Sequence, residues 1–263
     1  SQIIRKEVDR REIKIDRVIR LHYIELDEPK IDIPKGDINY LLEAMEAQWE
    51  LSGLTYNFSV VQTLQKILKK GGRKVTVAIF EGSEILSVWP GYHDSIFGVS
   101  LDVGSTTVAA CLSDLSSGDV ITSVNTMNPQ IRFGEDLMSR VSFAMMNFNG
   151  VHQMTESIRG AINDLLHELT EESNVPLNSI LEISIVANPV MHHILLGIDP
   201  CELGGAPFSL AIDTSVSEAA VNFGLNINPG GKVYVLPCIA GHVGADTAGV
   251  ILSEKPFSNE ELT

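Results

Sequence analysis

The stretch FGVSLDVGSTTVAACLSDLSSGDV, residues 97–120, constrains the fold of this chain more than any other. Two apolar runs lie on either side of a Gly-Ser-Thr-Thr bend, and Asp102 stands just before that bend. The run after the bend has the pattern of a strand, so the bend joins two strands. A Walker A loop or a Rossmann fingerprint would open a helix, and neither glycine pattern is present. The stretch therefore predicts a β-hairpin with a short polar turn.

The bend between these strands has the parts of a small anion-binding site. Gly104 lets the backbone approach a ligand closely. The three residues that follow offer consecutive N–H groups and hydroxyls: Ser105, Thr106 and Thr107. A carboxylate at Asp102 would repel phosphate, but it suits a hydrated Mg²⁺ that also binds phosphate oxygens. The alternative is a plain hairpin in which Asp102 caps the turn, and the residues alone leave both interpretations open.

Charge is divided unevenly along the 263 residues. Residues 1–95 are nearly neutral, whereas residues 96–263 contain 5 Lys and Arg against 19 Asp and Glu, a net charge of −14. Such an acidic surface repels nucleic acid and anionic lipid, so we expect neither as a partner. An anionic ligand in this part would need backbone N–H groups or a divalent cation, because cationic side chains are scarce.

Targeting signals and cysteine usage indicate a cytoplasmic protein. No run of 18 apolar residues is present that would span a membrane, and the charged residues 1–20 do not resemble a secretory signal. The cysteines form no CxxC or zinc pattern and are expected to be reduced thiols: Cys111, Cys201 and Cys238.

Hydrophobic periodicity changes near residue 95. Residues 1–95 predict a small α+β unit with helices at 38–51 and 59–70. Beyond it, strands alternate with helices, which predicts a mixed or parallel sheet covered by helices. The strands of this second part are expected at 97–103, 107–113, 119–126, 180–187 and 232–238, and its helices at 134–148, 151–173, 190–196 and 242–254.

The helix predicted at 134–148 is expected to pack through one apolar stripe. That stripe consists of Leu137, Val141, Met145 and Phe148. A group of methionines in the same region is expected to fill the core rather than to form a partner groove: Met138, Met145, Met146 and Met154.

Four sequence blocks, in order, resemble one known family. LDVGSTTVAACL (101–112) is similar to the first phosphate motif of the superfamily of actin, sugar and acetate kinases and heat-shock chaperones. Three further blocks are similar to segments of the reductive activators of corrinoid proteins: MNPQIRFGEDLMSRV (127–141), VANPVMHHILLGIDPCELGGAPF (186–208) and VLPCIAGHVGADTAGVIL (235–252). The chain departs from that family at 187–190, where a GNTT-type start is usual, and at His242, where Phe is usual.

This resemblance implies an α/β fold with an actin-like ATPase lobe, a ribonuclease H-like mixed sheet flanked by helices. Residues 1–95 would form the linker and a small α+β middle region. Residues 96–263 would form the first lobe of the actin, sugar kinase and chaperone-like ATPase domain, ending before the second phosphate motif. Such a fragment would hold half of a nucleotide cleft and is expected to be inactive alone.

The resemblance also implies a function, namely ATP-dependent reductive activation of a corrinoid protein from Co(II) to Co(I). ATP and Mg²⁺ would be the cofactors, and the electron would come from a [2Fe-2S] domain that is not present in this chain. The partner would be the corrinoid protein of a methyltransferase system in anaerobic one-carbon metabolism, and homodimer formation stays open. The alternatives are an actin-like or chaperone-like ATP-binding interaction module and a small-molecule kinase of the same superfamily.

The candidate site combines the bend with residues from the other blocks. Asp102 is the candidate for Mg²⁺ or phosphate, and Asp246 is a second acidic candidate, for positioning water. The nucleotide-binding residues are expected to be Gly104, Ser105, Thr106, Thr107, Asn128, Gln130, Asn188, Gly241 and Gly244. For Asn128 and Gln130 the alternative role is loop hydrogen bonding, and for Asn188 it is helix capping. His193 is expected to be a core histidine rather than a ligand.

Overall fold

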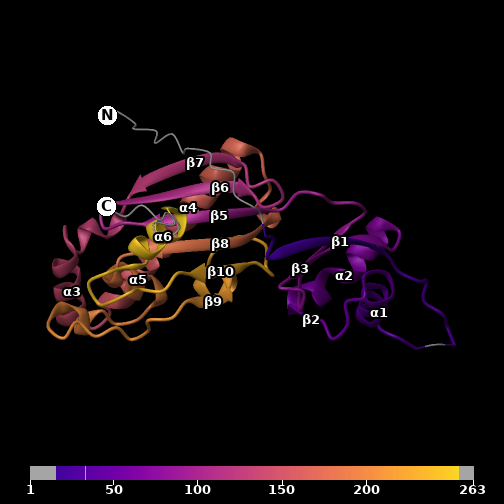
Figure 1. Ribbon diagram of the computed structural model, residues 1–263, viewed down its shortest axis with the longest axis horizontal. Helices are drawn as coiled ribbons and strands as arrows, with labels where there is room; N and C mark the ends of the chain where they lie inside the picture. Colours follow the sequence, from indigo (N-terminus) through magenta and orange to yellow (C-terminus); the bar gives the residue numbers. More distant parts are fainter. Residues whose placement is uncertain (1–15, 33, 255–263) are drawn as a thin grey trace, which may run out of the picture.

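The computed structural model describes residues 16–32 and 34–254, which form two units in sequence order (Figure 1). The first unit is built on a four-stranded sheet and the second on a six-stranded sheet. The chain passes from one sheet to the other between residues 90 and 97, where the hydrophobic pattern changes.

The first unit packs two helices on a sheet of order β1-β3-β4-β2. Its elements are β1 (Ile19–Glu25), α1 (Asp37–Trp49), β2 (Thr55–Tyr56), α2 (Phe58–Gly71), β3 (Lys74–Phe80) and β4 (Glu84–Pro90). The N-cap of α2 is Asn57, whose side chain accepts a hydrogen bond from the N–H of Ser59. Residues four apart on α2 lie on one face of the helix and are buried there: Val60, Leu64 and Leu68.

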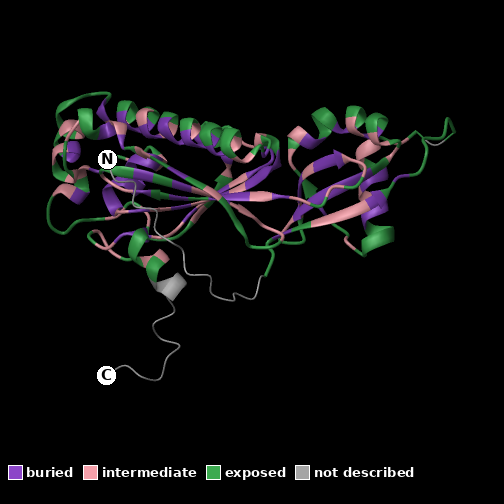
Figure 2. Cartoon of the chain, turned by 90° about the horizontal axis from the view of Figure 1, so that it is seen from above, coloured by how far each residue is buried: buried purple, intermediate pink, exposed green. Residues whose placement is uncertain are grey.

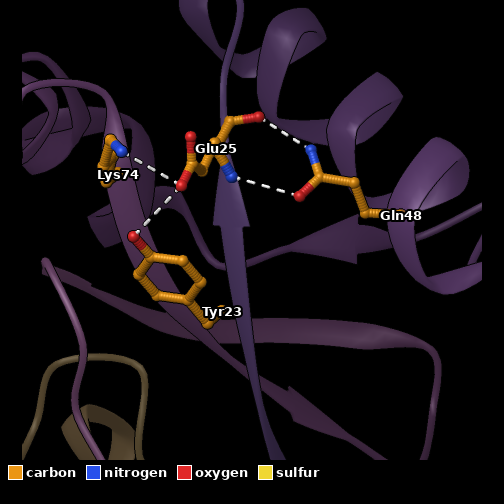
Figure 3. A network of polar contacts seen from close by, with 4 residues as sticks. All are labelled: Tyr23, Glu25, Gln48 and Lys74. Carbon is orange, nitrogen blue, oxygen red and sulfur yellow. Dashed lines mark hydrogen bonds and ion pairs between the residues drawn. The ribbon is translucent and has the colours of Figure 1, made fainter.

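Side chains of α1 cover part of the outer edge of β1. Gln48 accepts from the N–H of Glu25 at 3.2 Å and donates to its carbonyl at 2.7 Å (Figure 3). The indole N–H of Trp49 donates to the carbonyl of Tyr23 at 2.9 Å. The Glu25 carboxylate also forms an ion pair with Lys74 of the neighbouring strand β3, at 3.1 Å. Because bare edge strands invite pairing with other chains, these contacts close the end of this edge.

The second unit is built on a mixed sheet of order β7-β6-β5-β8-β10-β9. Its strands are β5 (Phe97–Val103), β6 (Thr107–Asp114), β7 (Val120–Met127), β8 (Ile180–Ala187), β9 (Val216–Ala219) and β10 (Lys232–Val235). Strands β5, β6 and β7 are antiparallel neighbours, β8 and β10 run parallel to β5, and β9 is antiparallel to β10. The expected mixed sheet is therefore present, and β9 is an addition to the strands predicted from the sequence.

Helices cover the two faces of this sheet unequally (Figure 2). The long helix α4 (Gly150–Ser173) packs against β6 and β7, and its buried apolar stripe is part of the core of the sheet: Ile158, Ile162, Leu165, Leu166 and Leu169. On the opposite face, α6 (Ala245–Glu254) lies against β8, with Gly249 beside Val186. The remaining helices are α3 (Leu137–Met146) and α5 (Pro189–Leu196) and the short 3-10 turns η1 (Pro129–Arg132), η2 (Leu177–Ser179), η3 (Cys201–Gly204) and η4 (Ala220–Phe223).

Helix α3 buries only the first half of the stripe that the sequence predicted, since Val141 is buried and Leu137 packs against the core. It ends at Met146, and Phe148 beyond it is fully exposed, as is most of Met145. Its buried residues are Arg140 and Val141, in the turns that pack against η3, α4 and α5. The last turn extends past those elements, which explains why its apolar residues remain exposed.

The prediction that the methionines of this region fill the core is also wrong. Met154 is buried on α4, but Met138, Met145 and Met146 are 48%, 68% and 78% exposed. The physical reason is the same, because α3 lies at the rim of the unit and contacts its neighbours only with one face.

The two units are joined by close backbone packing and polar contacts. Asn228 donates to the hydroxyl of Ser87 at 3.0 Å, and Lys232 forms an ion pair with Glu84 at 2.7 Å. A Cβ on Gly230 would lie 1.8 Å from the carbonyl oxygen of Leu86. The joint therefore requires glycine at this position.

Gly230→Ala is expected to lower the free energy of unfolding by about 1–3 kcal/mol, because both clashing groups belong to the backbone and cannot rotate away. Urea unfolding of the variant and the wild type measures the difference. Gly205→Ala is the matched control, since a Cβ there meets nothing within 4 Å. Equal stability of the Gly230 variant and the control would contradict the tight joint.

Candidate functional site

The predicted site residues meet at one edge of the six-stranded sheet. Val103 at the end of β5 pairs with Ala187 at the end of the parallel β8, and the bend and Asn188 follow directly. A Cβ on Gly244 would lie 2.6 Å from the Cα of Asn188, which brings the start of α6 to the same edge. Ligand sites of α/β sheets form at the carboxyl ends of parallel strands. The fold thus brings together the first, third and fourth sequence blocks there, and contacts of Asn128 and Arg140 with the bend add the second.

Hydrogen bonds from residues later in the chain hold the carbonyls of Gly104, Ser105 and Thr106. The side-chain amide of Asn128 donates to the carbonyl of Gly104 at 2.8 Å, and its backbone N–H donates to that of Thr106 at 2.8 Å. Arg140 donates to the carbonyl of Ser105 at 2.5 Å. The bend is therefore fastened from one side by residues that lie 20 to 40 positions further along the chain.

These contacts orient the N–H groups of the bend. In a planar trans peptide the C=O of one residue and the N–H of the next point in opposite directions. With the carbonyls of Gly104 and Ser105 bonded to Asn128 and Arg140, the N–H groups of Ser105 and Thr106 face away from those side chains. Neither N–H forms a hydrogen bond within the described part of the chain. Successive outward N–H groups are what an anion-binding site of this kind requires, and anion binding at the bend stays a prediction.

Asp102 lies on the face of the sheet opposite α4. It is exposed, and its register partners are Ala109 on β6 and Val186 on β8. A cavity of about 340 Å³ lies on this face next to it, lined in part by Cys111 and Ser184. A carboxylate at this position is exposed and stands two residues before Gly104, where the bend begins.

Asn128 and Gln130 are fully buried and directed into the loop that supports the bend. The Asn128 side chain also accepts from the N–H of Gln130 at 2.9 Å and caps η1. Gln130 donates to the carbonyl of Met154 at 2.8 Å. Both side chains thus make the loop hydrogen bonds that were the alternative to direct ligand contact, and direct contact stays a prediction.

The residues of the other two blocks have defined local roles. Asn188 caps α5 by accepting from the N–H of Met191 at 3.0 Å. A Cβ on Gly241 would lie 1.8 Å from the carbonyl oxygen of Phe208, so glycine permits this loop crossing. Asp246 is exposed in the first turn of α6 and accepts from the N–H of Thr247 at 2.8 Å. Its position suits the helix dipole, and the proposed role toward water stays a prediction.

Arg140 is a site residue that the sequence analysis missed. It is completely buried, and besides Ser105 it contacts the carbonyl of Gly134 at 3.1 Å and the sulfur of Met191 at 3.1 Å. The sequence could have indicated its burial, because Arg140 stands next to Val141 of the predicted apolar stripe in a largely apolar helix. Charged residues are almost never fully buried without a role for the charge.

The two adjacent histidines of α5 are core residues. His193 Nε2 accepts from the N–H of Ala211 at 3.0 Å, and its Nδ1 lies 2.9 Å from the carbonyl oxygen of Pro189, which confirms the expectation of a satisfied core histidine. Burial lowers the pKa of His192 to about 4, so this ring is neutral near pH 7. Among the described residues, no group of three or more His, Cys, Asp or Glu could hold a metal ion.

Another cavity lies away from the bend, along β1. It measures about 960 Å³, and its lining includes His22, Trp49, Tyr92 and His93. It shares no residue with the bend or its supporting loop. In the part of the chain that the structure describes, no helix is long and apolar enough to cross a membrane.

Two family models match consecutive parts of this chain. The model of the RACo linker region matches residues 8–95, and the model of the RACo middle region matches residues 97–255. A curated relative, the corrinoid activation enzyme RamQ of Eubacterium limosum, is 28% identical over 200 residues, which are 75% of this chain and 34% of RamQ.

A solved structure gives the same result for the fold. The structure described as a reductive activator for corrinoid, iron-sulfur protein superposes with a TM-score of 0.81 at 28% identity. The match covers 96% of this chain and 41% of that one. The fold is accordingly that of an actin-like ATPase, and the chain spans between a third and a half of the relatives it matches.

Proposed function

This chain belongs to the RACo family, and we propose that the protein it is part of carries out ATP-dependent reductive activation of a corrinoid protein. The observation that carries the proposal is the bend 104–107, whose carbonyls are held from behind and whose N–H groups face outward. The names of the relatives support the partner, since RamQ is a corrinoid activation enzyme and the solved relative acts on a corrinoid, iron-sulfur protein.

The residues at the bend fit the phosphates of a nucleotide. Ser105 and Thr106 offer N–H groups and hydroxyls, and Gly104 has no room for a side chain, since a Cβ would lie 2.8 Å from the carbonyl oxygen of Thr107. Asp102 would hold a hydrated Mg²⁺ beside those phosphates, and Thr107 would contribute its hydroxyl. ATP, when bound, supplies free energy for a change in the arrangement of the protein. The residues of this chain then bind and orient the phosphate end of the nucleotide.

An iron–sulfur cluster does not fit the cysteines of this chain. All three thiols are free, and burial raises the pKa of each one, to about 11 for Cys201. Ligation requires thiolates, which a raised pKa disfavours. The proposal therefore assigns the [2Fe-2S] cluster to a domain outside this chain.

Such an activator must make the strongly reducing Co(II)/Co(I) couple of its corrinoid partner accessible to the electron donor. A protein that binds the Co(I) state of its partner more tightly than the Co(II) state raises the potential of that couple. For one electron, about 1.4 kcal/mol of differential binding shifts it by roughly 59 mV. A preference of about 4 kcal/mol, which one interface can supply, would shift it by roughly 170 mV.

The test is the reduction of a methyltransferase-system corrinoid protein by the full-length protein under anaerobic conditions. The absorbance of the cobalt centre is followed with an electron donor and either Mg·ATP or adenosine. We expect Co(I) to accumulate with Mg·ATP and not with adenosine. Equal reduction in both would refute ATP dependence. ATP turnover stimulated by a sugar-like substrate, and not by the corrinoid protein, would favour a kinase instead.

A further inference from the structure

Among the described residues, the buried guanidinium of Arg140 contacts only neutral groups. Its donors reach the carbonyls of Ser105 and Gly134, the amide oxygen of Gln130 at 3.5 Å and the sulfur of Met191. No carboxylate lies within ion-pair distance of it in the described residues. The acidic group that acts on it is Asp136, which is exposed to solvent at the start of α3.

Burying a guanidinium among neutral groups costs free energy unless another group compensates its charge. Buried charges in proteins are paired or bound to a counter-ion, because an isolated one loses its hydration. Burial accordingly lowers the pKa of Arg140. The guanidinium also stands directly behind the bend, one hydrogen bond away from the Ser105 carbonyl, in a part of the chain where Lys and Arg are scarce.

We propose that Arg140 is a positioning residue for the bend and that its charge makes the bend selective for anionic ligands, specifically the polyphosphate of a nucleotide. The hydrogen bond to the Ser105 carbonyl keeps the N–H of Thr106 turned outward. The positive charge of the guanidinium, from behind the bend, adds to the attraction of an anion at these N–H groups. The guanidinium acts through the backbone and does not touch the ligand. This inference rests on the proposed function, because it assigns a polyphosphate to the same bend.

Met191 offers a test that leaves Arg140 in place. Its sulfur lies 3.1 Å from a guanidinium nitrogen, and it occupies the third position of α5, where Glu is favourable after an Asn cap. Met191→Glu places a carboxylate beside Arg140 and cancels its charge, whereas Met191→Gln has the same shape without charge. In the full-length protein we expect Met191→Glu to bind Mg·ATP about tenfold more weakly than Met191→Gln. The two variants should bind adenosine equally well.

A second pair of variants keeps the proposal falsifiable if the Glu variant does not fold. Arg140→Met removes the charge and the hydrogen bond to Ser105, and should weaken Mg·ATP binding roughly 10- to 100-fold. Arg140→Lys keeps the charge and should recover part of that loss, a rescue that a purely structural role would not give. Circular dichroism confirms that each variant is folded.

Calorimetry with Mg·ATP, magnesium tripolyphosphate and adenosine separates the outcomes. Equal Mg·ATP affinity of the Met191 variants, or losses that are the same for adenosine and for ATP, would overturn the role of Arg140 and leave the proposed function standing. A wild-type protein that binds neither Mg·ATP nor tripolyphosphate would overturn the proposed function and this inference with it.

Discussion

Asp102→Asn is expected to reduce the ATP turnover of the full-length protein by roughly 10- to 100-fold, the usual cost of losing a carboxylate that orients a metal ion and its waters. The carboxylate is exposed near the end of β5 and stands two residues before Gly104 of the bend. Asparagine keeps the size and polarity of the side chain but not its charge. The measurement is the steady-state rate of phosphate release against Mg²⁺ concentration, in which the variant should also require more Mg²⁺.

A matched change at the other end of the same sheet controls for surface charge. Asp119→Asn removes one exposed carboxylate beside the turn between β6 and β7, at the edge of the sheet opposite the bend. It should leave turnover unchanged. If Asp102→Asn turns over ATP at the wild-type rate, the carboxylate is a turn residue and the Mg²⁺ assignment is wrong.

Asn128→Ala is expected to lower the free energy of unfolding by about 2–4 kcal/mol, because one buried and one partly buried backbone group lose their hydrogen-bond partners. The carbonyl of Gly104 loses its donor, and the N–H of Gln130 loses its acceptor. The bend would then be fastened by Arg140 and one backbone contact only. Nucleotide affinity should fall together with stability, since the outward direction of the Ser105 N–H depends on the Gly104 carbonyl.

Urea unfolding of Asn128→Ala beside Asn125→Ala makes this prediction specific. Asn125 is exposed on β7, three residues earlier. Its replacement should change stability by less than about 0.5 kcal/mol. If the two variants unfold alike, the Asn128 amide does not hold the bend, and the account of the site would have to rest on Arg140 alone.

The elements of the fold were largely predictable because they depend on local patterns. The apolar alternation of β5 and β6 and the stripe of α4 each predicted an element close to the one observed. The prediction was wrong at α3, where Met145 and Phe148 fit a helical stripe that has no neighbour to pack against. A hydrophobic period shows which residues share a face, but not whether another element covers that face.

The candidate site was predictable only in part. The bend, its glycine and Asp102 could be chosen from the sequence, because they are adjacent and their chemistry is local. The supports of the bend could not, since Asn128 lies 24 residues and Arg140 35 residues from the carbonyls they hold. A polar residue in a loop or an arginine in a helix can have many structural roles, and the sequence does not show which role it has until its contacts are known.

By itself, the sequence determined the order of strands and helices, the acidic character of the second unit and the hairpin with its polar bend. These features follow from side-chain period, charge count and turn chemistry, which act over a few residues. Only the tertiary structure decided that the carboxyl ends of β5 and β8 and the start of α6 meet at one edge. It alone turned the N–H groups of the bend outward, because that direction is set by hydrogen bonds to its carbonyls from distant residues.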